Sequence, residues 1–156
     1  MTKSARGMGR PRRTRANARR ARDFFAVVAV THQVWTVATE QGLVTVQGDA
    51  GRLTVPFWAS ESEAARMREP LGVRPTARAV RVSAQEWLAD LLPALAARGW
   101  TVGIAWAGPD AVGFDLEPGE ATTALLSRWR SAGRARSVGW RAALTSAGMT
   151  CVPFGW

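Results

Sequence analysis

The chain has 156 residues, of which 47% are hydrophobic, which suits one domain with a buried core and is short for two. A single histidine and a single cysteine exclude a multi-histidine metal site and an internal disulfide, and no apolar run reaches the 18 residues of a membrane span. The net charge of +9 comes from the ends: residues 1–22 hold nine cations and residues 121–156 hold five, neither range contains an acid, and all twelve acids lie between them.

The first 21 residues are predicted to form an arginine-rich arm that is disordered to about residue 14. Residues 1–22 contain no Leu, Ile, Val or aromatic residue, so ordering them costs about 1–2 kcal/mol per residue in backbone entropy with no burial to offset it. The arm is either a solvated tail or a segment that binds nucleic acid or another anionic surface. The candidate nucleic-acid contacts are Arg10, Arg12, Arg13, Arg15, Arg19, Arg20 and Arg22.

The first half of the domain is predicted to be one helix followed by three strands. Residues 15–32 favour the helix, because alanine is frequent and apolar residues recur on one face. The β-branched and aromatic residues of 34–39, 43–47 and 52–55 indicate strands, and turn-forming residues separate them. We expect these strands to form an antiparallel meander that stops at Pro56.

Two helices and a strand are predicted next. Ser60 with Glu63 and Ser83 with Glu86 have the spacing of capping boxes, so a helix should begin at each serine. Residues 79–82, between them, favour a short strand. The second helix, 84–97, contains a proline at position 93 that should kink it.

The last part of the chain is predicted to be a hairpin, a helix and an irregular tail. Residues 101–106 and 111–116 flank a turn, and a helix follows from Pro118 to about Arg130. Three glycines should break residues 131–156 into an irregular tail that also contains arginine and tryptophan.

These elements predict an α+β fold. We expect a single small domain over residues 22–130, with a mixed or antiparallel sheet of about five to six strands, helices packed against it, and basic flexible termini.

No catalytic, cofactor-binding or metal-ligating residue is predicted, and we expect a protein that is not an enzyme and uses no cofactor. His32 falls on the inner face of the first helix and is interpreted as a helix-end or core residue, and Cys151 has no second cysteine. Asp115 and Glu117 occupy alternate strand positions, so they form either a carboxylate pair or the charged start of the last helix. The chain has none of the glycine-rich phosphate-binding or nucleophile motifs.

Tryptophan is unusually frequent, with eight residues. Trp58 and Trp100 lie at the ends of predicted elements, where a half-exposed indole can bind a partner, and are the candidate partner-binding residues. Trp129 and Trp140 each precede an arginine, which is typical either of base stacking and anionic surfaces or of an amphipathic helix that docks on the domain. Three others fall in predicted core elements: Trp35, Trp87 and Trp106.

A family resemblance covers residues 24–126. It rests on Val34-Trp35, on Val55-Pro56-Phe57-Trp58 and on Leu92-Pro93-Ala94-Leu95 at these distances from one another. This pattern resembles the bacterial domain-of-unknown-function family numbered 2750 and, more distantly, the SseB-like enhanced-serine-sensitivity domains. The resemblance implies a compact α/β sandwich-like domain without known activity and an accessory or interaction role.

The sequence therefore predicts a cytoplasmic protein-interaction domain with an unknown protein partner and no membrane contact, whose binding surface is centred on Trp58. The lack of paired cysteines fits a reducing compartment. Two alternatives stay open. One is a nucleic-acid-associated protein that binds through its arginine-rich termini, and the other is an immunity protein of a bacterial toxin system.

Overall fold

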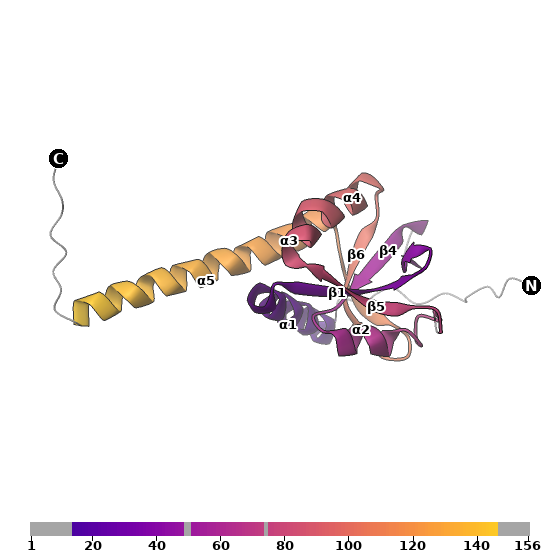
Figure 1. Cartoon of the computed structure of the whole chain (residues 1–156), viewed down its shortest axis with the longest axis horizontal. Helices are drawn as coiled ribbons and strands as arrows, with labels where there is room; N and C mark the ends of the chain where they lie inside the picture. The colour runs from indigo at the N-terminus through magenta and orange to yellow at the C-terminus, as the bar shows by residue number, and fades with distance from the viewer. Residues whose placement is uncertain (1–13, 49–50, 74, 147–156) are drawn as a thin grey trace, which may run out of the picture.

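Two small sheets and the helices around them make up the computed structural model, which describes residues 14–48, 51–73 and 75–146, with side chains to residue 134 (Figure 1). This is the α+β fold expected from the sequence. The elements in chain order are α1 (Arg15–Thr31), β1 (Gln33–Thr39), β2 (Gly42–Leu43), β3 (Val46–Gln47), β4 (Leu53–Phe57), α2 (Glu61–Met67), β5 (Arg78–Ser83), α3 (Ala84–Glu86), the π-helical turn η2 (Trp87–Leu91), α4 (Leu92–Ala97), β6 (Thr101–Ala107), β7 (Val112–Leu116) and α5 (Pro118–Ser146).

The strands form one sheet of order β2-β1-β5 and one of order β3-β4-β6-β7. All pairs are antiparallel except β4 and β6, which run parallel. The sheets are joined where Trp35 and Trp58 exchange two backbone hydrogen bonds, each 2.8 Å long. The strand β4 therefore leaves β6 at its carboxyl end and turns towards β1.

Both antiparallel pairings of the expected three-stranded meander are present, but its middle strand is divided between the two sheets. The predicted strand 43–47 divides into β2, which pairs with β1, and β3, which pairs with β4. Between them Val44 is buried, and its N–H donates to the carbonyl of Val37. The third strand is covered on both faces for most of its length, which is typical of a strand with a parallel neighbour. What the sequence did not predict is the further neighbour of each outer strand, β5 beside β1 and β6 beside β4, and the continuation of β4 through Pro56 to Phe57.

The helix α1 begins earlier than the predicted domain. Thr14 caps it, and its side-chain oxygen accepts a hydrogen bond from the N–H of Asn17. Asn17 is buried and its side chain donates to the carbonyl of Gly113 at 3.4 Å. Residues 15–21, which the sequence assigned to the arm, are therefore part of α1 and pack against the domain. Residues 1–13 lie outside the described residues.

The predicted helix 84–97 contains a π-helical turn just before Pro93, where the sequence predicted a kink. The segment divides into α3, η2 and α4, and the N–H of Leu92 bonds to the carbonyl of Trp87, five residues back. Pro93 then lies at the start of α4, where its missing N–H costs no helical hydrogen bond.

The last helix is longer than predicted. It was expected to end near Arg130, with an irregular segment after it, but α5 continues to Ser146. Gly133 and Gly139 each cost about 1 kcal/mol relative to alanine, while many of the residues around them are alanine and arginine, which favour helix. Figure 1 shows α5 starting on the body of the domain and extending well beyond it. Residues 147–156 lie outside the described residues.

Within the described part of the chain, no helix combines the length and the apolar character that crossing a membrane requires.

Candidate functional site

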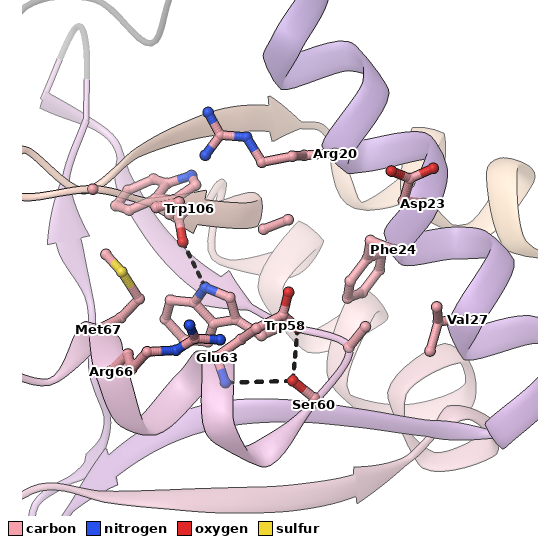
Figure 2. A pocket seen from close by; sticks show the side chains of 14 residues that line it. Arg20, Asp23, Phe24, Val27, Trp58, Ser60, Glu63, Arg66, Met67 and Trp106 are labelled. Carbon is pink, nitrogen blue, oxygen red and sulfur yellow. Dashed lines mark hydrogen bonds between the residues drawn. The ribbon is translucent and has the colours of Figure 1, made fainter.

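A crevice of about 540 Å³ opens where β4 and β6 reach their carboxyl ends (Figure 2). The two strands pair as far as Phe57 and Ile104 and then separate, because Trp58 pairs with β1. Crevices at the carboxyl ends of neighbouring parallel strands are common binding sites. The crevice is lined by Arg20, Asp23, Phe24, Val27, Trp58, Ala59, Ser60, Glu63, Arg66, Met67, Ala105, Trp106, Ala107 and Gly108.

Trp58 belongs to the wall of this crevice, but it is not the half-exposed residue that the sequence predicted. Only 1% of it is exposed. Its indole N–H donates to the carbonyl of Trp106 at 2.8 Å, and its backbone is paired with Trp35. A partner in the crevice would therefore contact the neighbours of Trp58 more than its indole.

The other indole of the wall, Trp106, depends on two glycines. A Cβ atom at Gly103 would lie 2.6 Å from the indole, and one at Gly113 would lie closer still. The pairing of β6 with β7 is irregular between Ile104 and Ala107. Within this stretch, Ala105 has a left-handed backbone with φ of 50°. Irregular strands and strained residues of this kind are frequent at functional sites.

Charged side chains of both signs form the rim. Arg20 and Asp23 come from α1, and Glu63 and Arg66 come from α2 (Figure 2). Arg20 donates to the side-chain oxygen of Asn17 at 3.0 Å, and Glu63 accepts from the Ser60 hydroxyl at 2.9 Å. An apolar wall with such a rim fits a segment that carries both apolar and charged groups.

Asp115 and Glu117 have separate partners. The carboxylate of Asp115 accepts the indole N–H of Trp106 at 2.9 Å. Both oxygens of Glu117 are bound by the guanidinium of Arg52, which also donates to the carbonyl of Gly99 at 2.9 Å. The hydrogen bonds from Arg52 lower the pKa of Glu117. Each carboxylate is thus engaged by a different side chain, and the carboxylate that accepts a backbone N–H at the start of α5 is that of Glu120, which accepts from the N–H of Glu117 at 2.8 Å.

His32 is a helix-end residue, and its expected place on the inner face is wrong. It is exposed and ends α1 in a left-handed conformation with φ of 57°. Its ring stacks on Trp129, with ring centroids 5.4 Å apart. Trp129 in turn donates to the carbonyl of Ala29 at 3.1 Å, so this indole docks α5 on α1. The side chain of Trp140 and the whole of Cys151 lie outside the description.

The two candidate partner-binding tryptophans are not brought together. Trp100 is half-buried just before β6 begins, whereas the crevice lies at the other end of that strand. The guanidinium of Arg98 lies over the Trp100 ring, 5.4 Å from its centroid. Trp100 therefore adds nothing to the crevice.

The candidate arginines divide into three groups. Arg15, Arg19 and Arg22 are exposed and recur at i, i+4 and i+7 on α1, away from its buried face. Arg20 lines the crevice instead, and positions 10, 12 and 13 lie outside the described residues.

The fold brings this stripe of α1 to the last helix. The guanidinium of Arg128 on α5 donates to the backbone carbonyl of Arg22 at 3.4 Å. We call the four residues Arg15, Arg19, Arg22 and Arg128 the basic surface. It joins the two acid-free ends of the chain.

Sequence reasoning missed most of the crevice. Asp23, Val27 and Glu63 belong to helices that are separated in sequence, and only the run that ends at Trp58 signalled that something lay there. For the contact between α1 and α5, Trp129 was a signal, because one interpretation placed it on an amphipathic helix that docks on the domain, but nothing in the sequence specified α1 as the helix it would meet. In the residues whose side chains are described, no three metal-ligating groups come together.

The fold defines a small α+β domain made of two joined sheets. The chain belongs to the family described as "Protein of unknown function (DUF2750)", whose family model matches residues 21–125. This confirms the resemblance to that family, while the kinship with SseB-like domains stays a prediction. The comparison with curated proteins found no match, and neither did the comparison with solved structures.

Proposed function

We propose that this protein associates with nucleic acid and binds the phosphate backbone through its basic surface. The observation that supports the proposal is the contact between Arg128 and Arg22, which unites two segments that hold fourteen cations and no acid in the sequence. The sequence favoured a protein-interaction role centred on Trp58. Because that indole is buried, we propose the nucleic-acid alternative in place of a role centred on Trp58.

The chemistry of the basic surface suits phosphates. A guanidinium binds two phosphate oxygens at once and is less strongly hydrated than an ammonium group. Exposed charges act together only within a Debye length, which is about 8 Å at physiological ionic strength. Along the helix axis Arg15 and Arg19 are about 6 Å apart and Arg19 and Arg22 about 4.5 Å apart, so neighbouring members of the stripe satisfy this condition. Such contacts position a duplex without specifying its sequence.

The proposal is tested by comparing two double variants of equal charge. Arg19→Gln with Arg22→Gln removes two cations from the basic surface, while Arg78→Gln with Arg81→Gln removes two exposed cations from β5. We expect the first pair to weaken binding of a fluorescent 20-base-pair duplex about tenfold at 100 mM salt, and the second pair to change it less than about twofold. Equal losses would show that only bulk charge matters and would contradict the proposal.

A second candidate function is protein interaction at the crevice. It is favoured by the left-handed Ala105 and by the separation of β4 and β6, which together form a concave site with a charged rim. Neutralisation of a toxin would be one form of this role. Both candidates are proposed for a cytoplasmic protein.

The matched pair Val27→Asp and Val30→Asp tests this second candidate. Both valines are exposed on α1, at 42% and 80%, and only Val27 lines the crevice. A partner protein of the crevice should be retained by wild type and by Val30→Asp in an affinity purification, and should be lost by Val27→Asp. A partner that all three retain binds elsewhere, and the crevice proposal then fails.

A further inference from the structure

The strand β5 is an edge of the sheet β2-β1-β5, and in the described part of the chain no strand pairs with its outer side. It pairs with β1 along its whole length, from Arg78 to Ser83. None of the residues that line the crevice comes from β5, and none of its arginines belongs to the basic surface. An edge strand offers backbone N–H and C=O groups that proteins either protect or use to bind another strand.

The register of β5 on β1 shows which of its backbone groups point outward. Arg81 lies opposite Trp35, and Ala79 lies opposite Val37. The backbone N–H and C=O of Trp35 are bonded on the β4 side, and the carbonyl of Val37 accepts a hydrogen bond on the β2 side, so these groups point away from β5. In an antiparallel pair, the residue opposite such a position also directs its N–H and C=O away from the neighbouring strand. The N–H and C=O groups of Ala79 and Arg81 therefore point to the outer side of β5.

Side chains cap both ends of this outer side and leave its middle without a paired strand. At the start, the guanidinium of Arg68 donates to the carbonyl of Ala77 at 3.2 Å. At the end, the carboxylate of Glu86 accepts the N–H of Ser83 at 3.2 Å. The outward groups between these caps are two donors that alternate with two acceptors. An extended polypeptide matches this alternation, whereas a phosphate backbone accepts hydrogen bonds but does not donate them.

The charge of this edge favours one kind of strand. Arg78 and Arg81 are exposed, and within the described residues neither guanidinium has a hydrogen bond or an ion pair. Because these residues are three positions apart in a strand, their side chains lie on opposite faces of the sheet. A strand added beside β5 would therefore meet one cation on each face, and β5 itself contains no acid. Opposite charges on neighbouring strands stabilise their pairing, and like charges destabilise it.

We propose that β5 binds an extended acidic segment of a partner protein, which extends the sheet beyond β5 by one strand. The backbone of the segment bonds to the outward groups of Ala79 and Arg81, and its carboxylates pair with the guanidinium groups of Arg78 and Arg81. A second copy of β5 suits this edge less well, because it would bring two more arginines to the same short edge. The two arginines thus oppose self-association and favour an acidic strand.

The charge requirement is tested with a fluorescent ten-residue peptide of alternating glutamate and valine, whose anisotropy reports binding to the full chain. We expect saturable binding at about 100 mM salt, where surface ion pairs are only partly screened. Arg78→Gln with Arg81→Gln should weaken it about tenfold, and Arg19→Gln with Arg22→Gln should change it less than about twofold. The two pairs exchange the roles that they have in duplex binding, so failure here is distinguishable from failure of the proposed function. Equal losses from both pairs, or no binding up to about 1 mM peptide, would overturn the proposal.

Ala79→Pro tests the backbone pairing. Proline at this position removes an outward N–H and no bond to β1, and edge strands tolerate proline at such positions. The variant should bind the same peptide at least about tenfold more weakly, whereas Ala79→Val, which is close to proline in size and keeps the N–H, should change binding less than about twofold. Equal binding by the two variants would show that no strand is added.

The peptide itself gives a second measurement, which does not depend on the folding of the proline variant. N-methylation of its four central residues removes their N–H donors and should weaken binding to the wild-type protein at least about tenfold. Binding that survives N-methylation would be ion pairing alone and would overturn the proposal. Sedimentation of the protein without peptide should show no dimer that Ala79→Pro dissociates, because such a dimer would make a second copy the occupant.

Discussion

Trp58 is held by its backbone and its side chain at once. Two hydrogen bonds join its backbone to Trp35, and its indole donates to the carbonyl of Trp106. Its ring packs in the core cluster that also contains Val37, Ala64 and Met67. At the scale of the residue, this tryptophan belongs to the packing that keeps the two sheets joined.

Replacement of Trp58 should therefore unfold the protein more easily. We expect Trp58→Ala to lower the free energy of unfolding by about 3–5 kcal/mol, the usual cost of truncating a core aromatic residue. Trp100→Ala is the control, because that indole is only half-buried and its loss should cost less. Urea denaturation measures the free energy of unfolding of the two variants and of the wild type. An equal or smaller loss at Trp58 would mean that its indole is not part of the core.

The pair of Arg52 and Glu117 makes stability depend on pH. The hydrogen bonds from Arg52 lower the pKa of Glu117 below its ordinary value of 4.5, and the same pair raises the pKa of Arg52. A carboxylate with a lowered pKa stabilises the folded state above its ordinary pKa, and this contribution is lost as the pH falls through the lowered value.

Below pH 4.5 the wild-type protein should lose stability in part because Glu117 becomes protonated and its bonds to Arg52 weaken. Glu117→Gln has no carboxylate at this position, so its stability should lack this part of the pH dependence. Thermal melting from pH 7 to pH 3 measures this, with the difference between wild type and variant largest at pH 7 and shrinking in acid. Because the pair is exposed, the difference should also shrink in high salt. A difference that grows as the pH falls would contradict the assignment.

At the scale of the element, the hairpin of β6 and β7 is shaped around Trp106. A Cβ atom at Gly113 would meet the indole, and it would lie 2.8 Å from the carbonyl oxygen of Ile104, which is backbone and cannot move aside easily.

We expect Gly113→Ala to destabilise the protein by at least about 2 kcal/mol, in the range of overpacked cores. Gly119→Ala is the matched control, because nothing lies within 4 Å of a Cβ atom there, in the first turn of α5. It should be neutral or slightly stabilising. Chemical denaturation of both variants tests the packing, and a neutral Gly113→Ala would show that the hairpin has room for a side chain.

Local chemistry made several elements predictable. Ser83 and Glu86 form both bonds of the predicted capping box, and the hydrogen bonds from Ser83 lower the pKa of Glu86. The hairpin at residues 101–116 was likewise expected, because its turn formers lie between two runs of mostly apolar residues. Pairing between distant strands was not predictable: β4 and β6 are separated by two helical segments and by β5, and no residue of either specifies the parallel register.

At the scale of the whole molecule, residues 14–22 and the first turns of α5, which are the described parts of the two basic segments nearest the domain, belong to the domain's surface. The arginine stripe of α1 is held by the buried Asn17 and Ala21 on the opposite face of the same helix. Composition predicted a basic arm and a basic tail, but only the tertiary packing of α1 on α5 unites them. The crevice was unpredictable for the same reason, because its lining comes from α1, α2 and two strands.

The salt dependence of duplex binding is the most direct test of the central claim, that the basic surface binds phosphates. Each phosphate neutralised contributes about −0.9 to the slope of log K against log salt. The wild-type slope should therefore be steep, and Arg19→Gln with Arg22→Gln should make it shallower by about 1.8, while Arg78→Gln with Arg81→Gln leaves it unchanged. A slope near zero, or one that both pairs change equally, would contradict the account.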